Sequence, residues 1–360
     1  MAVSTSQPGR PGLKQFRSEG CYSYLFFDPR QREAVLVDPK LELLDDYREY
    51  LGSIKLVLCV DTHTHADHFS ATHIVGSQFN CPIGMSTRTE SGRATRRLAG
   101  GEKIKVGQFQ LEVLETPGHT PDAISLFGHG MVFTGDTLMI GSSGRTDFPG
   151  ADPAKQWNSL HGVLGKLPGE TVLLPGHDYN DLIFSTLAHE RKTNPHWLIE
   201  SVDAFADMKS RDCATGDKDE IASYVKFNRD LNPGPPTARF AGGGTACGTA
   251  APVTDRSAAI SVEKYQAKLQ EHDPEFAFVD VRERSEFEAG RMPGAVNIPM
   301  SEVPLHFAEL ARKQRVYLSC LSGRRSGMVA RTLSYLGFHD VVNVTGGFKS
   351  WTQVGLPVEK

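Results

Sequence analysis

The most informative part of this sequence is Asp61-Thr-His63-Thr-His65-Ala-Asp67-His68. It directly follows the apolar run Lys55-Leu-Val-Leu-Cys-Val60, which predicts a strand. Three of the 13 histidines in the chain lie in this short stretch. Imidazole is the commonest metal ligand in proteins, so this density of histidine predicts a metal site.

Local geometry suggests how these side chains lie. Side chains two residues apart on an extended segment point the same way, so we expect His63 and His65 to face one cation. A helix is predicted over residues 66–79. Asp67 and His68 at its start can then face a second position.

Three further candidate ligands each follow another apolar, strand-like run. They are His119 after residues 109–115, Asp136 after residues 131–134, and His177 after residues 171–174. Ligand sites in layered α/β proteins gather at strand ends, where loops converge. Four motifs in this order therefore predict one shared site.

Residues from about Gly20 to Leu231 resemble the metallo-β-lactamase superfamily. The resemblance rests on His63-x-His65-x-Asp67-His68, His119, Asp136 and His177. It implies an αββα sandwich, an α/β fold with metals at one edge of two packed sheets. Periodicity alone indicates only mixed α and β structure.

Length and composition fit two domains of an ordinary soluble protein. The chain has 360 residues and a net charge of −4, which argues against broad nucleic-acid binding. No apolar run approaches the roughly 20 residues of a membrane helix, and the N-terminus lacks the features of a secretory signal. The six cysteines are scattered, which favours reduced thiols in the cytoplasm. We expect small molecules as partners, and the sequence leaves open whether the chain forms a homo-oligomer.

Proline and glycine mark a boundary between the two domains. Asn232-Pro-Gly-Pro-Pro236 halts any helix, and residues 241–252 are small and flexible in composition. The predicted domains are 1–231 and 257–360, with a linker at 232–256. Helices are expected before the linker, over residues 181–193 and 196–210.

The second domain resembles the rhodanese family. Three separated motifs carry this resemblance: residues 276–299, residues 316–326 and Gly346-Gly347-Phe348-x-x-Trp351. It implies a smaller α/β domain with a parallel sheet. Asp280 and Arg282 in the first motif are expected to form a structural ion pair at a strand end.

A reactive cysteine is predicted at Cys320. A strand over residues 315–319 runs into it, and a helix is expected over 326–336, so backbone N–H groups would converge on the loop between them. Such a cradle lowers a thiol pKa and holds anions. The active-site loop is Leu321, Ser322, Gly323 and Arg324, and Arg325 is a candidate catalytic residue with Cys320. The six-residue length of Cys320–Arg325 is typical of sulfur transfer in this family.

Two chemistries suit the metal site. The superfamily includes hydrolases with two zinc ions and oxygenases with one iron, and a 2-His-1-carboxylate face is typical of non-haem Fe(II). Gly144-Arg145-Thr146-Asp147-Phe148 and Gly176-His177-Asp178-Tyr179 resemble the glutathione persulfide dioxygenases. This resemblance implies one Fe(II) per chain and glutathione as co-substrate. The implied residues are His63, His119 and Asp136 on iron, Arg145 and Tyr179 on glutathione, and His65, Asp67, His68 and His177 in support or as a second metal site.

The favoured function is persulfide oxidation joined to sulfur transfer. Glutathione persulfide and O2 would give sulfite and glutathione, and Cys320 would carry sulfur between thiosulfate or sulfite and glutathione or its persulfide. The two activities handle the same sulfur atom, which explains their fusion. The main alternative is a two-zinc glyoxalase II-type thioester hydrolase fused to a sulfurtransferase. A sulfur-sensing carrier with a structural metal is a further alternative, although structural zinc is usually closed by four protein ligands.

Overall fold

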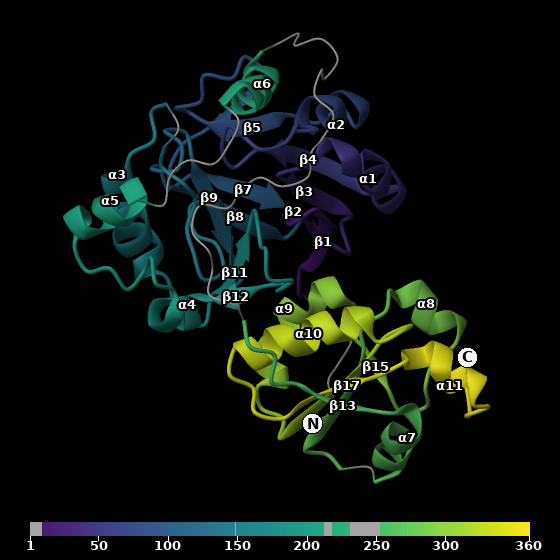
Figure 1. The fold of residues 1–360 in the computed structure, drawn as a ribbon. Coiled ribbons are helices and arrows are strands. Elements are labelled where there is room, and N and C mark those ends of the chain that lie inside the picture. Colours follow the sequence, from purple (N-terminus) through teal and green to yellow (C-terminus); the bar gives the residue numbers. More distant parts are fainter. Residues whose placement is uncertain (1–8, 148, 212–217, 231–252, 272) are drawn as a thin grey trace. The chain divides into compact units, whose positions relative to one another are not determined.

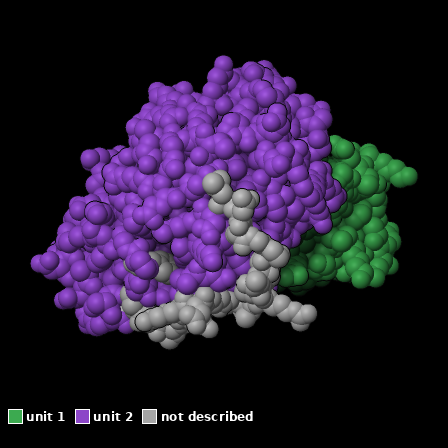
Figure 2. Space-filling view, turned by 90° about the horizontal axis from the view of Figure 1, so that it is seen from above, with its two compact units in different colours: residues 1–10, 180–183, 252–360 green, residues 11–179, 184–251 purple. Residues whose placement is uncertain are grey.

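The computed structural model describes residues 9–147, 149–211, 218–230, 253–271 and 273–360. Within them the chain forms two compact units, coloured separately in Figure 2. The first unit along the chain, purple and labelled unit 2 in Figure 2, holds residues 11–179 and 184–230. The second unit along the chain, green and labelled unit 1 in Figure 2, holds residues 9–10, 180–183 and 253–360. Most of the predicted linker, up to residue 252, lies outside the described residues.

Two mixed sheets form the centre of the first unit (Figure 1). The first sheet has the strand order β1 (Gly12–Ser18), β2 (Cys21–Asp28), β3 (Glu33–Val37), β4 (Lys55–Val60), β5 (Ile83–Ser86), β6 (Arg96–Leu98). The second has the order β12 (Ser185–Thr186), β11 (Val172–Pro175), β10 (Met131–Gly135), β9 (Ile124–Gly128), β8 (Phe109–Glu115), β7 (Lys103–Val106). The strands expected at 55–60 and 109–115 are confirmed as β4 and β8.

Aromatic side chains join the two sheets. Phe26 on β2 lies with its ring centroid 6.3 Å from those of Phe109 and Phe133, and Tyr24 lies 5.3 Å from Phe133. These rings meet edge to face, which is a favourable arrangement for buried aromatic pairs. The inner faces of the sheets therefore form one core.

Helices cover the outer faces, so the unit is an αββα sandwich (Figure 1). On the first sheet, Tyr47 of α1 (Leu44–Leu51) and Val75 of α2 (Thr72–Gln78) share a core with strand residues. A 3₁₀ turn, Leu41–Leu43, precedes α1. The remaining helices of the unit are α3 (Pro153–Asn158), a π turn (Ser159–Val163), a 3₁₀ turn (Leu164–Lys166), α4 (Leu187–Thr193), α5 (Val202–Arg211) and α6 (Lys218–Arg229).

Three helices begin later than their sequences predict. The helix expected from residue 66 starts at Thr72, because Ser70 and Thr72 hydroxyls bond to Asp61 and hold residues 61–71 as a loop. The helix expected from residue 181 starts at Leu187, since Ser185 and Thr186 pair with β11. The third, expected from residue 196, starts at Val202 as α5.

The second unit contains a parallel sheet flanked by helices, as the rhodanese resemblance implies (Figure 1). The strand order is β13 (Ala258–Ile260), β17 (Val341–Val344), β16 (Arg315–Ser319), β14 (Phe276–Asp280), β15 (Val296–Asn297). The helices are α7 (Val262–Gln270), α8 (Arg284–Ala289), a 3₁₀ turn (Met300–Glu302), α9 (Val303–Leu310), α10 (Arg324–Tyr335) and α11 (Gly347–Gln353). The expected strand 315–319 is confirmed as β16, and the helix expected from 326 begins two residues earlier.

Candidate metal centre and candidate sulfur-transfer loop

The candidate metal ligands lie in loops that follow four strands of the sandwich. The segment His63–His68 follows β4, His119 follows β8, Asp136 follows β10 and His177 follows β11. The strands come from both sheets, and their ends meet at one edge. The structure thereby brings into one region all the ligands that were predicted from separate motifs.

His63, His119 and Asp136 form a compact cluster of three donors. Their donor atoms lie within 4.8 Å of one another, and all three side chains are buried. The Oδ2 atom of Asp136 lies 4.0 Å from His63 Nε2 and 3.8 Å from His119 Nε2. A single cation could contact all three donors.

Hydrogen bonds to the far side of each imidazole fix its orientation. His63 Nδ1 lies 3.0 Å from Thr62 Oγ1, and Thr62 Oγ1 donates to Asp38 at 2.9 Å. His119 Nδ1 donates to the carbonyl oxygen of Arg145 at 2.7 Å. Both rings therefore present Nε2 to the cluster, and His63 Nε2 is buried without a hydrogen-bond partner.

The protonation states suit a bound cation. Burial holds the pKa of His63 well below its usual value and also lowers the pKa of His119. Burial alone would raise the pKa of Asp136, but His177, His63 and His119 hold it below its usual range. The cluster thus offers two neutral imidazoles and one carboxylate, which is the donor set that a divalent metal ion needs.

Two glycines leave room for the cluster. A Cβ atom at Gly176 would lie 2.7 Å from Asp136 Oδ1, and one at Gly144 would lie 2.8 Å from His119 Nδ1. Any side chain at either position would displace a candidate ligand. The motifs that contain these glycines therefore serve the cluster as well as the loops around it.

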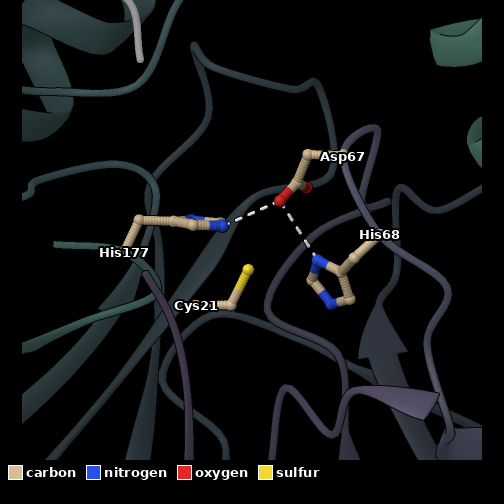
Figure 3. A group of neighbouring side chains, drawn as sticks. All are labelled: Cys21, Asp67, His68 and His177. Carbon is tan, nitrogen blue, oxygen red and sulfur yellow. Dashed lines mark hydrogen bonds and ion pairs between the residues drawn. The ribbon is translucent and has the colours of Figure 1, made fainter. Parts of the chain in front are cut away.

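A second cluster lies beside the first and contains a residue that the sequence analysis missed (Figure 3). Asp67 Oδ2 lies 2.7 Å from His177 Nε2 and 3.2 Å from His68 Nδ1, and the sulfur of Cys21 faces the same space. His177 Nδ1 contacts Asp136 Oδ1 at 2.6 Å. Burial alone would lower the pKa of His177, but Asp136 and its other neighbours raise it well above its usual value.

His65 belongs to a third group and does not share a cluster with His63. Its Nε2 atom lies 3.3 Å from Asp38 and 3.5 Å from Asp61. The alternation expected of an extended segment fails here because residues 61–71 form a loop after β4. His65 thus supports the loop through two buried carboxylates.

A cavity of about 660 Å³ lies next to the metal-ligand loop. Thr64 and Ala66 of that loop line it, together with Arg145 and residues of α6. Arg145 forms an ion pair with Asp147, with Nε 2.6 Å from Oδ1. Tyr179 does not line this cavity; it is 48% exposed and its ring stacks on that of His177. The two predicted glutathione contacts are therefore not brought together in one cavity.

The predicted reactive cysteine lies at the end of β16. Cys320 is buried, and its sulfur accepts from the Gly323 N–H at 3.1 Å and the Ser326 hydroxyl at 3.4 Å. Burial alone would raise the pKa of Cys320, but bonds from Ser326 and from the backbone N–H groups of Ser322 and Gly323 lower it overall. The loop therefore stabilises a thiolate.

The other loop residues differ in their exposure and in their contacts. Arg325 makes two bonds to Glu286, at 2.6 and 2.7 Å, while Arg324 and Leu321 are exposed. Gly323 has φ of +94°, the left-handed conformation that glycine adopts readily.

The two other rhodanese motifs form contacts outside the loop, and one of them reaches it. The Phe348 N–H donates to the Cys320 carbonyl at 2.8 Å, so the closing motif braces the loop. The ion pair expected between Asp280 and Arg282 is confirmed, at 2.7 Å and fully buried.

In the described part of the chain, no helix is both long and apolar enough to cross a lipid bilayer.

Comparisons with known proteins agree with this geometry. The metallo-beta-lactamase superfamily model matches residues 18–177, and the rhodanese-like domain model matches residues 261–354. The mouse protein named "Persulfide dioxygenase ETHE1, mitochondrial" is 36% identical over 201 residues, which cover 54% of this chain and 79% of the mouse protein.

Two solved structures are similar as well. The crystal structure of ETHE1 from Myxococcus xanthus is 33% identical with a TM-score of 0.58, and covers 60% of this chain and 97% of that one. A metallo-beta-lactamase from Staphylococcus aureus, 21% identical with a TM-score of 0.56, shares the fold over 92% of this chain and 99% of its own. The chain belongs to the metallo-β-lactamase superfamily, as a homologue of the ETHE1 persulfide dioxygenases that carries a C-terminal rhodanese domain.

Proposed function

We propose that this chain is a bifunctional enzyme that oxidises glutathione persulfide and transfers sulfane sulfur. In the first activity, glutathione persulfide, O2 and water give glutathione, sulfite and two protons. The open set of two imidazoles and one carboxylate at His63, His119 and Asp136 carries this proposal. Similarity to the mouse protein named as a persulfide dioxygenase supports it.

One ferrous ion per chain suits the three donors. Two histidines and one carboxylate with open positions are typical of non-haem iron oxygenases. When bound, Fe(II) supplies redox chemistry with O2 and a Lewis acid for the persulfide anion. The residues of the chain orient the donors of this site. Thr62 holds the ring of His63, and the Arg145 carbonyl holds the ring of His119. His177 contacts the Oδ1 atom of Asp136 and so holds that carboxylate.

The cavity beside the metal-ligand loop is the proposed glutathione site. Much of its lining is apolar, and Arg145 is among the residues that line it. A guanidinium group binds carboxylates through two parallel hydrogen bonds. The guanidinium of Arg145 is bonded to the carboxylate of Asp147, so a carboxylate of glutathione would displace Asp147 from it. Tyr179 lies outside this cavity, so its contact with glutathione requires that the ligand extend beyond the cavity toward His177.

Cys320 is the proposed carrier of sulfane sulfur. The thiolate attacks the outer sulfur of thiosulfate, the S–S bond of thiosulfate breaks, and sulfite leaves with the electron pair. Glutathione thiolate then attacks the outer sulfur of the Cys320 persulfide, which releases glutathione persulfide and restores the thiolate. Either step can run in reverse. The N–H groups of Ser322, Gly323 and Ser326 stabilise the anion at Cys320 throughout.

The proposal places the protein in the cytoplasm, with small molecules as its partners. The cysteines in the described ranges, Cys21, Cys59, Cys81 and Cys320, are all free thiols. Free thiols are expected in a reducing compartment.

A two-zinc thioester hydrolase is the second candidate, because Cys21, Asp67, His68 and His177 could hold a second ion. Anaerobically purified protein supplied with glutathione persulfide separates the two candidates. The proposed enzyme consumes one O2 for each sulfite formed and leaves S-lactoylglutathione intact. Thioester hydrolysis without O2 uptake would instead establish the hydrolase.

A further inference from the structure

Helix α6 packs directly against the metal-ligand loop. Phe69 of the loop meets Tyr224 and Phe227 of α6, with ring centroids 4.7 and 4.6 Å away. These three side chains form a small buried core of their own. The helix is more than 140 residues away in sequence, so the contact is purely tertiary.

Asn228 on this face of α6 uses both ends of its amide on the loop backbone. Its Nδ2 atom donates to the carbonyl oxygens of His65 and His68 at 2.9 and 2.8 Å. Its Oδ1 atom accepts from the Ser70 N–H at 2.9 Å. Asn228 is only 3% exposed, so water does not compete for these bonds. The three backbone groups of the loop therefore find in Asn228 the partners that a helix or a sheet would otherwise supply.

The other face of α6 forms a wall of the cavity that we propose for glutathione. The α6 residues and the residue after it that line the cavity are Ile221, Ala222, Val225, Lys226, Arg229 and Asp230. Tyr224, Phe227 and Asn228 recur at spacings of three and four on the opposite side, as the helical period requires. One rigid element thus contacts the ligand space and the metal-ligand loop at once, and the loop itself lines the same cavity through Thr64 and Ala66.

We propose that Asn228 is a positioning residue that couples the cavity to the metal centre, so that a glutathione-type ligand and the metal ion strengthen each other's binding. A ligand that packs on α6 fixes the helix against the loop. The loop carries His63 at its start. When the loop is ordered, His63 is held close to the other two candidate ligands, His119 and Asp136. Linkage requires the effect to be equal in both directions. The proposal rests on the proposed function only for the choice of glutathione as ligand.

S-methylglutathione is the probe, because its blocked sulfur is a poor metal ligand and leaves α6 and the loop as the route of coupling. Its affinity is measured by calorimetry with the metal-free full chain and with the chain loaded with Co²⁺. We expect Co²⁺ to tighten binding by about fivefold or more. In Asn228→Ala the ratio should fall to about one.

Asn297→Ala is the matched control. Asn297 is also buried and also donates through Nδ2 to two carbonyl oxygens, those of Asp280 and Arg282, but it lies in the rhodanese unit. This variant loses the same kind of bonds and should keep the full coupling. Asn228→Asp, which keeps the acceptor for Ser70 and loses only the donated bonds, serves if the alanine variant does not fold.

Equal affinity with and without Co²⁺ in the unmodified protein would overturn the proposal, as would full coupling in both Asn228 variants. The result is independent of turnover. A hydrolase could show the coupling, and a persulfide dioxygenase could lack it, so the two proposals fail separately.

Discussion

Thr62 joins a buried carboxylate to a candidate metal ligand, which makes it a sharp test of how the site is held. Its Oγ1 donates to Asp38 at 2.9 Å and lies 3.0 Å from His63 Nδ1. The hydroxyl has one hydrogen, so His63 donates its N–H and its Nε2 lone pair is left for the metal. Thr62→Val removes both bonds while it keeps the shape of the side chain.

The size of the effect follows from what is left without a partner. Asp38 keeps the Thr62 backbone N–H at 2.7 Å and lies 3.3 Å from His65, so the loss falls mainly on the buried Nδ1–H of His63. A buried group without its hydrogen bond costs about 1–3 kcal/mol. Loss of the partner of a ligating histidine lowers metal affinity about 10–100-fold. We therefore expect both changes in Thr62→Val.

Anaerobic titration with Co²⁺, followed by absorbance, measures the affinity, and thermal unfolding measures the stability. Thr332→Val is the matched control, because Thr332 is buried and donates to the Met328 carbonyl at 2.9 Å in the rhodanese unit. It should lower stability and leave Co²⁺ affinity unchanged. Co²⁺ binding by Thr62→Val at the strength of the unmodified protein would refute the role assigned to the hydroxyl.

Three further changes test the two sites separately. Cys320→Ser should abolish sulfur transfer from thiosulfate and leave O2 uptake with glutathione persulfide within about twofold; equal loss of both would show that the activities are not independent. Sulfur transfer should rise with pH as the thiol loses its proton, with a midpoint below the ordinary thiol value of 9.0, because hydrogen bonds favour the thiolate. Ser326→Ala removes one of these bonds and should move the midpoint upward, and an unchanged pH profile would exclude that bond. Arg145→Ala should raise the KM for glutathione persulfide about tenfold or more, as loss of a charge-assisted bond predicts, with iron content preserved; an unchanged KM would remove Arg145 from the substrate site.

The strands and the order of the candidate ligands could be read from the sequence because both depend on local patterns. The apolar run Lys55–Val60 and the alternating run Phe109–Glu115 are both short and typical of strands. A loop that follows a buried strand carries its polar residues to the edge of that sheet. Local patterns therefore predicted one shared site, but the grouping of His63, His119 and Asp136 came from the family resemblance, and the local expectation that His63 and His65 face one cation is wrong.

What the sequence could not give depends on contacts between distant segments. The start of α2 is set by bonds from Ser70 and Thr72 to Asp61, which compete with helical bonds and leave no local pattern. Cys21 and Asn228 reach the site from the far ends of the first unit, and neither lies in a recognisable motif. Tertiary packing alone assigns them their places.

The same limit applies to the predicted substrate contacts. Arg145 lines the cavity, but Tyr179 stacks on His177 outside its lining, because the chain turns after β11. The order of residues in a motif identifies the loop on which a side chain lies. It does not give the direction in which that side chain points.

The number of metal ions per chain, and the residues that hold them, distinguish the proposed iron centre from a two-metal centre. Iron and zinc are counted in anaerobically purified protein and in the variants His119→Ala and His68→Ala, with O2 uptake measured beside them. A centre built from His63, His119 and Asp136 predicts one iron per chain, lost with its O2 uptake in His119→Ala and retained in His68→Ala. Two metal ions per chain, of which His68→Ala loses one together with all activity, would contradict it.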